Sequence, residues 1–236
     1  MQQLNPSFLD KDQVLANWSR CIWASSISTE LFEDCVRPAL QVRHIHAGQY
    51  LWRANDLPLG WIGVTRGAAK LCVPTEDGRS IALCGFAGSW FGEASLLHRK
   101  SRLDCDAVAL HDLTMLILPD AAFQRLRNES ASFGQFLLTL MAERNQQLLR
   151  LITALQSADI TSRVAKCLGT LITPMNFPFP DAGLLNVTQS ELADFCRVSR
   201  SRFNEALLEL ERRDLLEVGY RSVRLKDVEG LRSYGT

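Results

Sequence analysis

The chain has 236 residues, with 26 Lys and Arg against 26 Asp and Glu, and 47% of its residues are hydrophobic. This apolar content excludes intrinsic disorder, and only 14 Gly and 8 Pro exclude a collagen-like or Gly/Pro-rich chain. The zero net charge excludes a surface that is basic throughout, although it leaves room for a local basic patch.

The first segment, residues 1–40, predicts short helices, because apolar residues such as Leu31, Cys35 and Leu40 recur there at helical spacing. The segment has no apolar signal-peptide core, and the longest nearly uncharged apolar stretch, Phe133 to Met141, is far too short to span a bilayer. We therefore expect a cytoplasmic protein with no membrane partner. Seven cysteines are scattered without metal-ligand spacing, so we expect mostly buried thiols and no metal site.

Residues 41–130 have a different sequence pattern, in which short apolar runs alternate with turns that contain glycine. Asp77-Gly78 lies between the apolar runs 70–73 and 80–83, which is a strong signal for a hairpin. Many short strands with closely spaced turns predict an antiparallel β-roll. With the helices around it, this segment makes the expected fold class α+β.

Residues 131–158 predict one long helix that serves as a dimerisation helix. A seam with alternating steps of four and three residues runs along it and is typical of a two-stranded coiled coil. Phe136 and Leu140 point to a neighbouring face and are expected to pack on the roll. An ordinary amphipathic helix buried in its own domain is the alternative. The predicted dimer interface consists of Leu137, Met141, Arg144, Leu148, Leu151 and Leu155.

The last segment, residues 159–236, predicts a winged helix-turn-helix. Thr188 and Glu191 form a capping-box pattern at the start of a short helix, and Ser199 is the N-cap candidate of the next helix. Phe203 and Leu207 lie on the apolar face of that second helix, and an apolar hairpin from residue 216 to 225 follows it. Two helices joined by a short turn and followed by a hairpin are typical of DNA-binding modules.

The exposed face of the second helix carries side chains that can read bases. Arg donates paired hydrogen bonds to guanine, Asn pairs with adenine, and Glu accepts from cytosine. Arg197 in the turn, and Arg221 and Arg224 on the wing, are placed to contact phosphate. The predicted DNA-binding residues are Thr188, Gln189, Arg197, Ser199, Arg200, Ser201, Arg202, Asn204, Glu205 and Arg221.

Three motifs in order resemble those of the CRP/FNR transcription regulators, over roughly residues 20–230. They are Gly88-Ser-Trp-Phe91-Gly92-Glu93, then Asp159-Ile-Thr-Ser-Arg163, then Thr188-Gln-Ser-Glu191-Leu192-Ala193. The resemblance implies a cyclic-nucleotide-binding-like roll as effector domain and a homodimer on a palindromic operator. It also implies a recognition helix in the major groove, with RNA polymerase as a further candidate partner.

The effector site departs from the family pattern. The resemblance implies that Glu93 would take a ribose hydroxyl, but Leu103 stands where cyclic-nucleotide-binding members have the arginine for the phosphate. Arg102 is one residue away, and on a strand that shift points it to the other face. Leu148 and Leu149 stand where such members contact adenine. The candidate effector pocket consists of Phe91, Gly92, Glu93, Arg102, Leu103, Leu148 and Leu149.

These departures disfavour cyclic AMP, because a desolvated phosphate needs a cation. An iron–sulfur cluster is disfavoured as well, since Cys21 and Cys35 are too far apart in sequence for the family's ligand set. Haem stays open, with the chain's four histidines, His44, His46, His98 and His111, as candidate ligands. The cofactor is therefore unknown, and either a non-cAMP effector or constitutive activity is expected. A regulator of the same fold that responds to a cyclic nucleotide or to haem is the alternative.

The recognition helix departs too, because Ser201 and Glu205 stand where the family usually has Glu and Arg. We therefore expect an operator that differs from the usual TGTGA- or TTGAT-type half-sites. The sequence contains no P-loop, GxSxG or HExxH motif, so no catalytic activity is expected. A sensor or interaction module without DNA binding is the remaining alternative, and the well-formed helix-turn-helix pattern argues against it.

Overall fold

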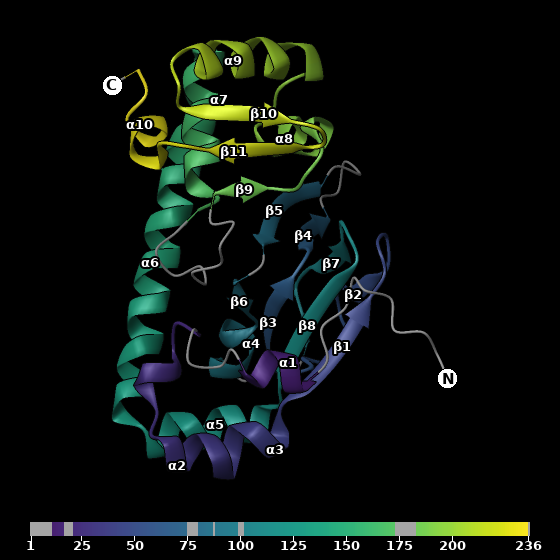
Figure 1. The fold of residues 1–236 in the computed structure, drawn as a ribbon, viewed down its shortest axis with the longest axis vertical. Coiled ribbons are helices and arrows are strands. Elements are labelled where there is room, and N and C mark those ends of the chain that lie inside the picture. The colour runs from purple at the N-terminus through teal and green to yellow at the C-terminus, as the bar shows by residue number, and fades with distance from the viewer. Residues whose placement is uncertain are drawn as a thin grey trace. The chain divides into compact units, whose positions relative to one another are not determined.

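The computed structural model describes residues 11–16, 21–74, 80–86, 88–98, 102–172 and 183–235 (Figure 1). The chain packs into two compact units, and the boundary between them falls within the long helix α6 (Ala131–Leu155), after Leu140. In the ranges given, no helix is both long enough and apolar enough to cross a membrane.

The first unit starts with the short helices expected before residue 40. They are α1 (Lys11–Ala16), η2 (Ala24–Ser26), α2 (Thr29–Leu31), η3 (Phe32–Val36) and α3 (Arg37–Ala39). Ser28 caps α2, since its Oγ accepts a hydrogen bond from the Leu31 N–H at 3.1 Å. The apolar side chains of this segment, Leu31, Phe32, Cys35 and Val36, are buried.

Two antiparallel four-stranded sheets form the roll, as the glycine-punctuated sequence predicts. Their strands are β1 (Gln41–Ile45), β2 (Tyr50–Trp52), β3 (Trp61–Arg66), β4 (Ala68–Pro74), β5 (Ser80–Phe86), β6 (Trp90–Phe91), β7 (Asp106–Ala109) and β8 (Leu113–Leu118). One sheet has the order β1-β8-β3-β6 and the other β2-β7-β4-β5. The β4–β5 pairing runs from Ala68 opposite Phe86 to Pro74 opposite Ser80. The predicted turn residues Asp77 and Gly78 lie outside the described residues.

The roll closes over an apolar core to which both sheets contribute, including Leu51, Ile62, Leu103 and Met115. Helices α4 (Glu93–Leu97) and α5 (Asp120–Glu129) complete the unit. Cys21, Cys35, Cys167 and Cys196 are buried and Cys72 and Cys105 are half-buried, which agrees with the expectation of mostly buried thiols.

An aromatic cluster joins the start of α6 to the roll. Trp61 and Trp90 have ring centroids 4.5 Å apart, and Trp23 lies 4.9 Å from Trp61. Phe133 and Phe136 of α6 lie against Trp61, at 5.6 and 6.3 Å between centroids. The expected packing of Phe136 on the roll is therefore confirmed, and edge-to-face contacts of this kind add stability beyond the buried area.

The second unit contains the rest of α6 followed by the predicted helix-turn-helix and wing. Its elements are α7 (Ile160–Thr170), β9 (Leu184–Leu185), α8 (Gln189–Phe195), α9 (Arg200–Arg212), β10 (Leu216–Gly219), β11 (Ser222–Leu225) and α10 (Val228–Arg232). The wing is a three-stranded sheet in the order β10-β11-β9, visible in Figure 1 as three strands side by side. Strand β9 and helix α10 have no counterpart in the sequence-based expectation.

The start of α7 is fixed by the Asp159–Arg163 motif. Asp159 Oδ2 accepts a hydrogen bond from the Ser162 N–H at 2.6 Å and so caps the helix. Arg163 donates through Nε and Nη2 to the Ser157 carbonyl at 3.0 and 2.7 Å. These bonds satisfy backbone groups that the end of α6 and the start of α7 would otherwise leave exposed.

Candidate nucleic-acid interface

Two side-chain caps, Thr188 and Ser199, start the two helices of the helix-turn-helix. The Thr188 Oγ1 accepts a hydrogen bond from the Glu191 N–H at 3.3 Å, and a Glu191 carboxylate oxygen accepts from the Thr188 N–H at 3.0 Å. This reciprocal pair is the predicted capping box at the start of α8. Ser199 Oγ accepts from the Arg202 N–H at 3.4 Å and starts α9. Residues 196–199 form the turn between the two helices.

The turn contains a residue in the left-handed region that is not glycine. Arg197 has φ of +55°, and its side chain is exposed. A non-glycine residue in this conformation costs about 1–2 kcal/mol. The tight turn therefore keeps an arginine at a position where glycine would be less strained.

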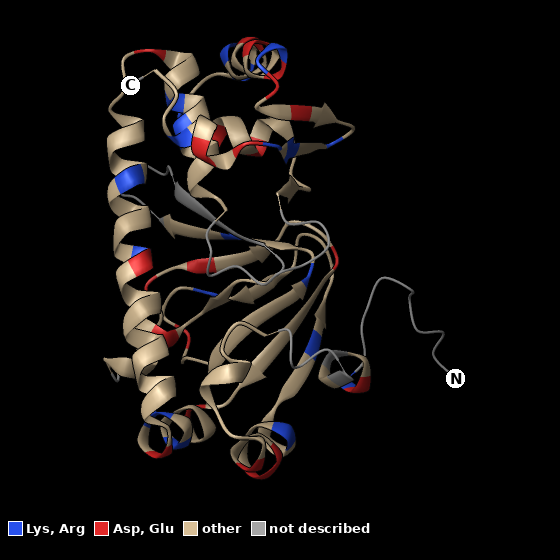
Figure 2. Cartoon of the chain, turned by 60° about the vertical axis from the view of Figure 1, so that its left-hand side comes forward, with Lys and Arg blue, Asp and Glu red and all other residues tan. Residues whose placement is uncertain are grey.

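One face of α9 is buried and the opposite face is exposed, as the helical wheel predicts. Phe203, Leu207 and Leu210 are at most 1% exposed. Arg200, Ser201, Arg202 and Glu205 are all exposed, and Asn204 is half-buried. Figure 2 shows basic and acidic positions around α9, the helix seen nearly end-on at the top. The first two turns of α9 therefore present the predicted base-reading side chains together.

The acidic residues of α9 fall into two groups. Glu209 accepts from Arg213 Nε at 2.8 Å and from Arg212 Nη1 at 3.3 Å, and chiefly the Arg213 bond lowers the pKa of this carboxyl. Glu211 accepts from the Val218 N–H at 2.8 Å and so fixes the start of the wing. Glu205 instead stays on the exposed face, where its Oε1 accepts from Ser201 Oγ at 3.3 Å. A carboxylate and a hydroxyl are thus presented side by side at the two positions where the resemblance led us to expect different side chains.

The wing ends in a two-residue loop, Tyr220-Arg221, between paired Gly219 and Ser222. Arg221 adopts φ of +52°, and both Arg221 and Arg224 are exposed, as their predicted phosphate contacts require. Tyr220 at the tip is 94% exposed.

The candidate effector residues divide between the two units. Phe91, Gly92, Glu93, Arg102 and Leu103 belong to the first unit, whereas Leu148 and Leu149 lie on the part of α6 that belongs to the second. Gly92 has φ of +96°, and a Cβ there would come within 2.9 Å of the Gly60 carbonyl oxygen, so only glycine fits.

The Glu93 carboxylate is already engaged inside the roll. Glu93 is 3% exposed, and its Oε2 accepts a hydrogen bond from the indole Nε1 of fully buried Trp61 at 3.2 Å. The same carboxylate is the one that the family resemblance assigns to a ribose hydroxyl. A ligand that takes Oε2 of Glu93 must therefore replace this internal hydrogen bond.

Arg102 and Leu103 differ in burial as expected, although neither lies on a strand, because β7 begins only at Asp106. Leu103 is buried in the roll core, and its backbone pairs with Asn55 and Asp56 at 2.8 and 2.9 Å. Arg102 is exposed and donates from Nη1 to the Asn55 carbonyl at 2.6 Å. The guanidinium is therefore held at the surface, and an apolar side chain stands where the resemblance expects the phosphate-binding cation.

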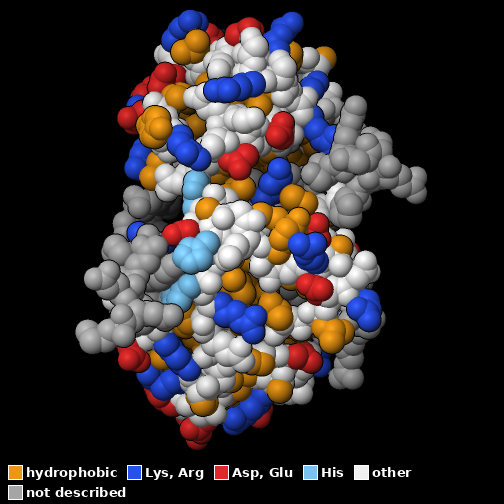
Figure 3. Space-filling model, turned by 90° about the vertical axis from the view of Figure 1, so that its right-hand side faces the viewer, with side chains coloured by type: hydrophobic (Ala, Val, Ile, Leu, Met, Phe, Trp, Pro, Cys, Tyr) orange, Lys and Arg blue, Asp and Glu red, His pale blue; other side chains and the backbone are white. Residues whose placement is uncertain are grey.

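The histidines raised as haem-ligand candidates lie toward the surface. His44, His46 and His98 are exposed and His111 is half-buried, and Figure 3 shows histidine side chains on one face. His46 Nδ1 lies 3.4 Å from Asp112 Oδ1, and His44 Nδ1 lies 3.5 Å from Thr114 Oγ1. Across the described ranges, no group of three or more His, Cys, Asp or Glu side chains is arranged to hold a metal ion.

Two family models match the chain in the order of its two units. Residues 42–130 match the cyclic nucleotide-binding domain, and residues 162–234 match the Crp-like helix-turn-helix domain. Together the matches take in more than two thirds of the 236 residues. The chain belongs to the CRP/FNR family of transcription regulators.

Known CRP/FNR proteins resemble this chain over most of its length. The cAMP-activated global transcriptional regulator Vfr of Pseudomonas aeruginosa is 24% identical over 186 residues, which are 74% of this chain and 86% of Vfr. FixK2 from Bradyrhizobium japonicum matches with a TM-score of 0.64 and 15% identity over 84% of this chain and 98% of its own. The c-di-GMP-responsive regulator CLP of Xanthomonas campestris matches with a TM-score of 0.56 and 19% identity, over 84% and 99%. These structural matches establish the shared CRP/FNR fold.

Proposed function

We propose that this chain is a homodimeric, sequence-specific regulator that inserts α9 into the major groove of a palindromic operator. The observation that carries the proposal is the geometry of α9. Its Ser199-capped start presents Arg200, Ser201, Arg202 and Glu205 outward, while Phe203 and Leu207 anchor the opposite face. The remaining predicted contacts, from Thr188 and Gln189 at the start of α8 to Arg221 on the wing, belong to the same unit.

Charge placement supports specific over non-specific binding. The net charge is zero, so affinity for DNA depends on the local arginines rather than on an overall field. Arg200 is suited to guanine, and Arg197 and Arg221 to phosphate. Transcription regulation implies action in the cytoplasm, where the DNA lies, and RNA polymerase as a further partner. This role requires no catalytic activity.

The first test is selection of binding sites from random duplexes, followed by affinity measurements over a range of salt concentrations. Loss of a base contact in Arg200→Ala is expected to weaken operator binding about 5- to 150-fold, which corresponds to ~1–3 kcal/mol. Arg221→Ala should weaken all sequences alike and reduce the salt slope by about 1. Arg43→Ala, an exposed arginine of β1, is the charge-matched control and should bind as the wild type. Equal affinity for all duplexes in the wild type would contradict the proposal.

Glu205 is proposed to set the operator sequence. Its carboxylate, held beside Ser201 Oγ, is an acceptor for a cytosine amino group and repels phosphate. Selection with Glu205→Ala should therefore relax the preference at one position of each half-site. If the wild type selects a TGTGA- or TTGAT-type half-site and Glu205→Ala selects the same one, Glu205 has no such role.

We further propose that the protein responds to an effector other than cyclic AMP or is constitutively active. The Trp61–Glu93 bond, the buried Leu103 and the outward Arg102 support this. Vfr is named as cAMP-activated and CLP as c-di-GMP responsive, so both nucleotides are the natural probes. Calorimetric titration at millimolar cyclic AMP should give no heat and no change in operator affinity. Saturable binding would establish the cyclic-nucleotide-responsive alternative, and a Soret band in the purified protein would establish the haem-responsive one.

A further inference from the structure

Two parallel stripes of apolar residues run along α6, offset by one residue. The first stripe is buried within the chain and consists of Phe133, Leu137, Leu140, Leu151 and Ala154, none of them more than 8% exposed. Leu137 and Leu151 were assigned to the dimer seam by the sequence pattern. Because their side chains are already covered, they are poor candidates for contact with a second chain.

The second stripe is open. Leu138, Leu148 and Ile152 are 65%, 46% and 54% exposed, and Met141 and Leu155 are half-buried. With Asn145, which is exposed, these residues follow each other in steps of three, four, three, four and three. Such spacing places all six on one narrow seam, the geometry of a left-handed two-stranded coiled coil.

A second copy of the same helix is the occupant that this stripe fits. The stripe carries no charged residue, and α6 as a whole has only Glu143, Arg144 and Arg150, as the nearly uniform tan of the long helix in Figure 2 shows. A membrane-surface helix would instead need a strongly basic opposite face. Isoleucine at the first core position of a heptad, here Ile152, and leucine at the second, here Leu148 and Leu155, favour two strands over three or four.

We infer that Asn145 meets its counterpart in the second copy at the centre of this seam and fixes the two helices as a parallel, in-register dimer. An apolar seam alone discriminates weakly between registers, because a shift of one heptad buries similar side chains. An amide that is buried without a partner costs about 1–3 kcal/mol. The parallel, in-register arrangement pairs both amides, whereas a shift of one heptad leaves both without a partner, which is how an asparagine at such a position specifies register.

Asn145 has this role only if the chain forms the proposed dimer. Within that dimer, the in-register pairing would give two-fold symmetry, which a palindromic operator requires. The residue thereby acts on DNA recognition without touching DNA. It is a positioning residue, and its substitution should change register and oligomeric state before it changes folding.

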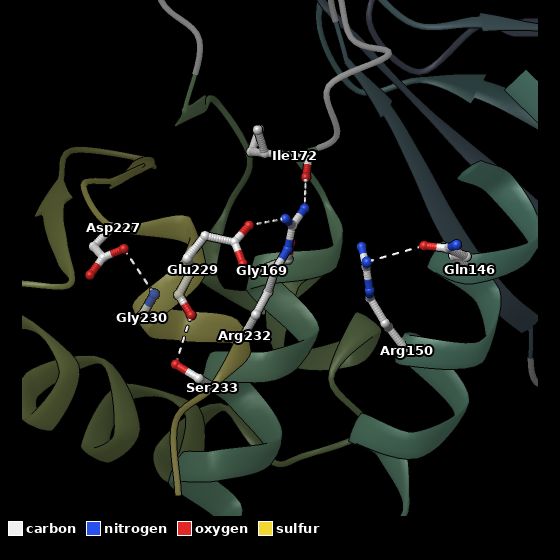
Figure 4. Close-up of polar contacts among 9 residues, drawn as sticks. All are labelled: Gln146, Arg150, Gly169, Ile172, Asp227, Glu229, Gly230, Arg232 and Ser233. Atoms are coloured by element: carbon white, nitrogen blue, oxygen red, sulfur yellow. Dashed lines mark hydrogen bonds and ion pairs between the residues drawn. The ribbon is translucent and has the colours of Figure 1, made fainter. Parts of the chain in front are cut away.

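Cysteine cross-linking tests the register directly. Under mild oxidation Asn145→Cys should form an intermolecular disulfide in high yield, because in-register core positions face each other within disulfide reach. Arg144→Cys would cross-link best if the seam followed residues 137, 144 and 151. Gln146→Cys is the control outside both seams; Gln146 lies on the exposed side, where its Oε1 accepts from Arg150 Nη2 at 3.3 Å (Figure 4). Cross-linking of Arg144→Cys in place of Asn145→Cys would overturn the inference.

Sedimentation tests the role of Asn145 separately from the existence of the dimer. Asn145→Leu should tighten self-association at least 10-fold and add species larger than a dimer, while Gln146→Leu should behave as the wild type. A dimeric Asn145→Leu variant with unchanged affinity would overturn the role of Asn145 and leave the proposed dimer intact. A wild-type chain that sediments as a monomer at tens of micromolar would overturn the dimer itself.

Discussion

The C-terminal helix α10 holds the end of α7 through one arginine. Arg232 Nε donates to the Gly169 carbonyl at 2.9 Å, and Arg232 Nη2 donates to the Ile172 carbonyl at 2.6 Å (Figure 4). Glu229 pairs with the remaining Nη1 of the same guanidinium. Both carbonyls belong to the last turn of α7 or follow it, where a helix has no intrahelical donors to offer. The Arg232 side chain is only 17% exposed, so water competes poorly for these positions.

Replacing Arg232 with methionine is expected to destabilise the end of α7 by about 2–3 kcal/mol. Hydrogen bonds to a charged donor contribute ~1.5–3 kcal/mol each, and the positive charge at a helix C-terminus adds about 0.3–1 kcal/mol. Part of the lost hydrogen-bond free energy is recovered, because water can bind the two carbonyls once the guanidinium is gone. Methionine keeps the apolar stem of Arg232, whose Cγ lies 2.9 Å from where a Cβ of Gly169 would be, so lost packing contributes little.

Amide hydrogen exchange measured by mass spectrometry is the suitable assay, because it resolves one unit from the other. A loss of ~2–3 kcal/mol corresponds to roughly 30- to 140-fold faster exchange in peptides from α7, at 1.4 kcal/mol per factor of ten. Arg212→Met is the control, since Arg212 is 73% exposed and pairs with Glu209 at 3.3 Å, a surface pair worth about 0–1 kcal/mol. If Arg232→Met accelerates α7 exchange less than threefold, or no more than Arg212→Met does, the assigned role of Arg232 is refuted.

Two further predictions concern the turn and a buried thiol. Arg197→Gly should raise the free energy of unfolding of the second unit by up to about 1 kcal/mol, because glycine accepts φ of +55° without strain. Operator affinity and its salt slope should both fall, because the arginine charge is lost. A stabilised variant with unchanged DNA binding would show that Arg197 is not part of the interface. Burial raises the pKa of the Cys21 thiol to about 12, whereas an unfolded thiol ionises near 9.0, so unfolding releases a proton above that pH. The free energy of unfolding should therefore fall as the pH rises from about 9 toward 12, by at most about 1.4 kcal/mol per pH unit. Urea titrations at pH 8 and 10 measure this fall, which should be smaller in Cys21→Ala than in the wild type.

The helix-turn-helix was predictable because its signals are local. Thr188 and Glu191 identify the start of α8, and Ser199 the start of α9, within three or four residues of sequence each. Strand β9 was not predictable from its two residues, since it exists by pairing with β11, some forty residues later. Helix α10 has five residues, and it is held by bonds from Arg232 to carbonyls 63 and 60 residues earlier.

In the long helix α6, the hydrophobic periodicity alone does not identify which apolar residues face a second chain. Its apolar residues satisfy two seams that share Met141, Leu148 and Leu155 and differ by one residue elsewhere. Sequence spacing could not choose between Leu137 and Leu138, because both have the right period and hydrophobicity. The choice is made by packing within the chain, which buries Leu137 and leaves Leu138 65% exposed. The effector region poses the same difficulty, since the Trp61–Glu93 hydrogen bond joins residues 32 positions apart.

That hydrogen bond also gives the protein an optical reporter. All five tryptophans precede residue 141, so indole emission reports on the first unit alone. The emission of Trp61 depends on the carboxyl oxygen that accepts from its Nε1 and on the aromatic surroundings formed with Trp23 and Trp90. A molecule that draws Glu93 Oε2 away from Trp61 would leave that indole N–H without its acceptor. The intrinsic fluorescence of the unlabelled protein can therefore be used to screen compounds for binding at Glu93.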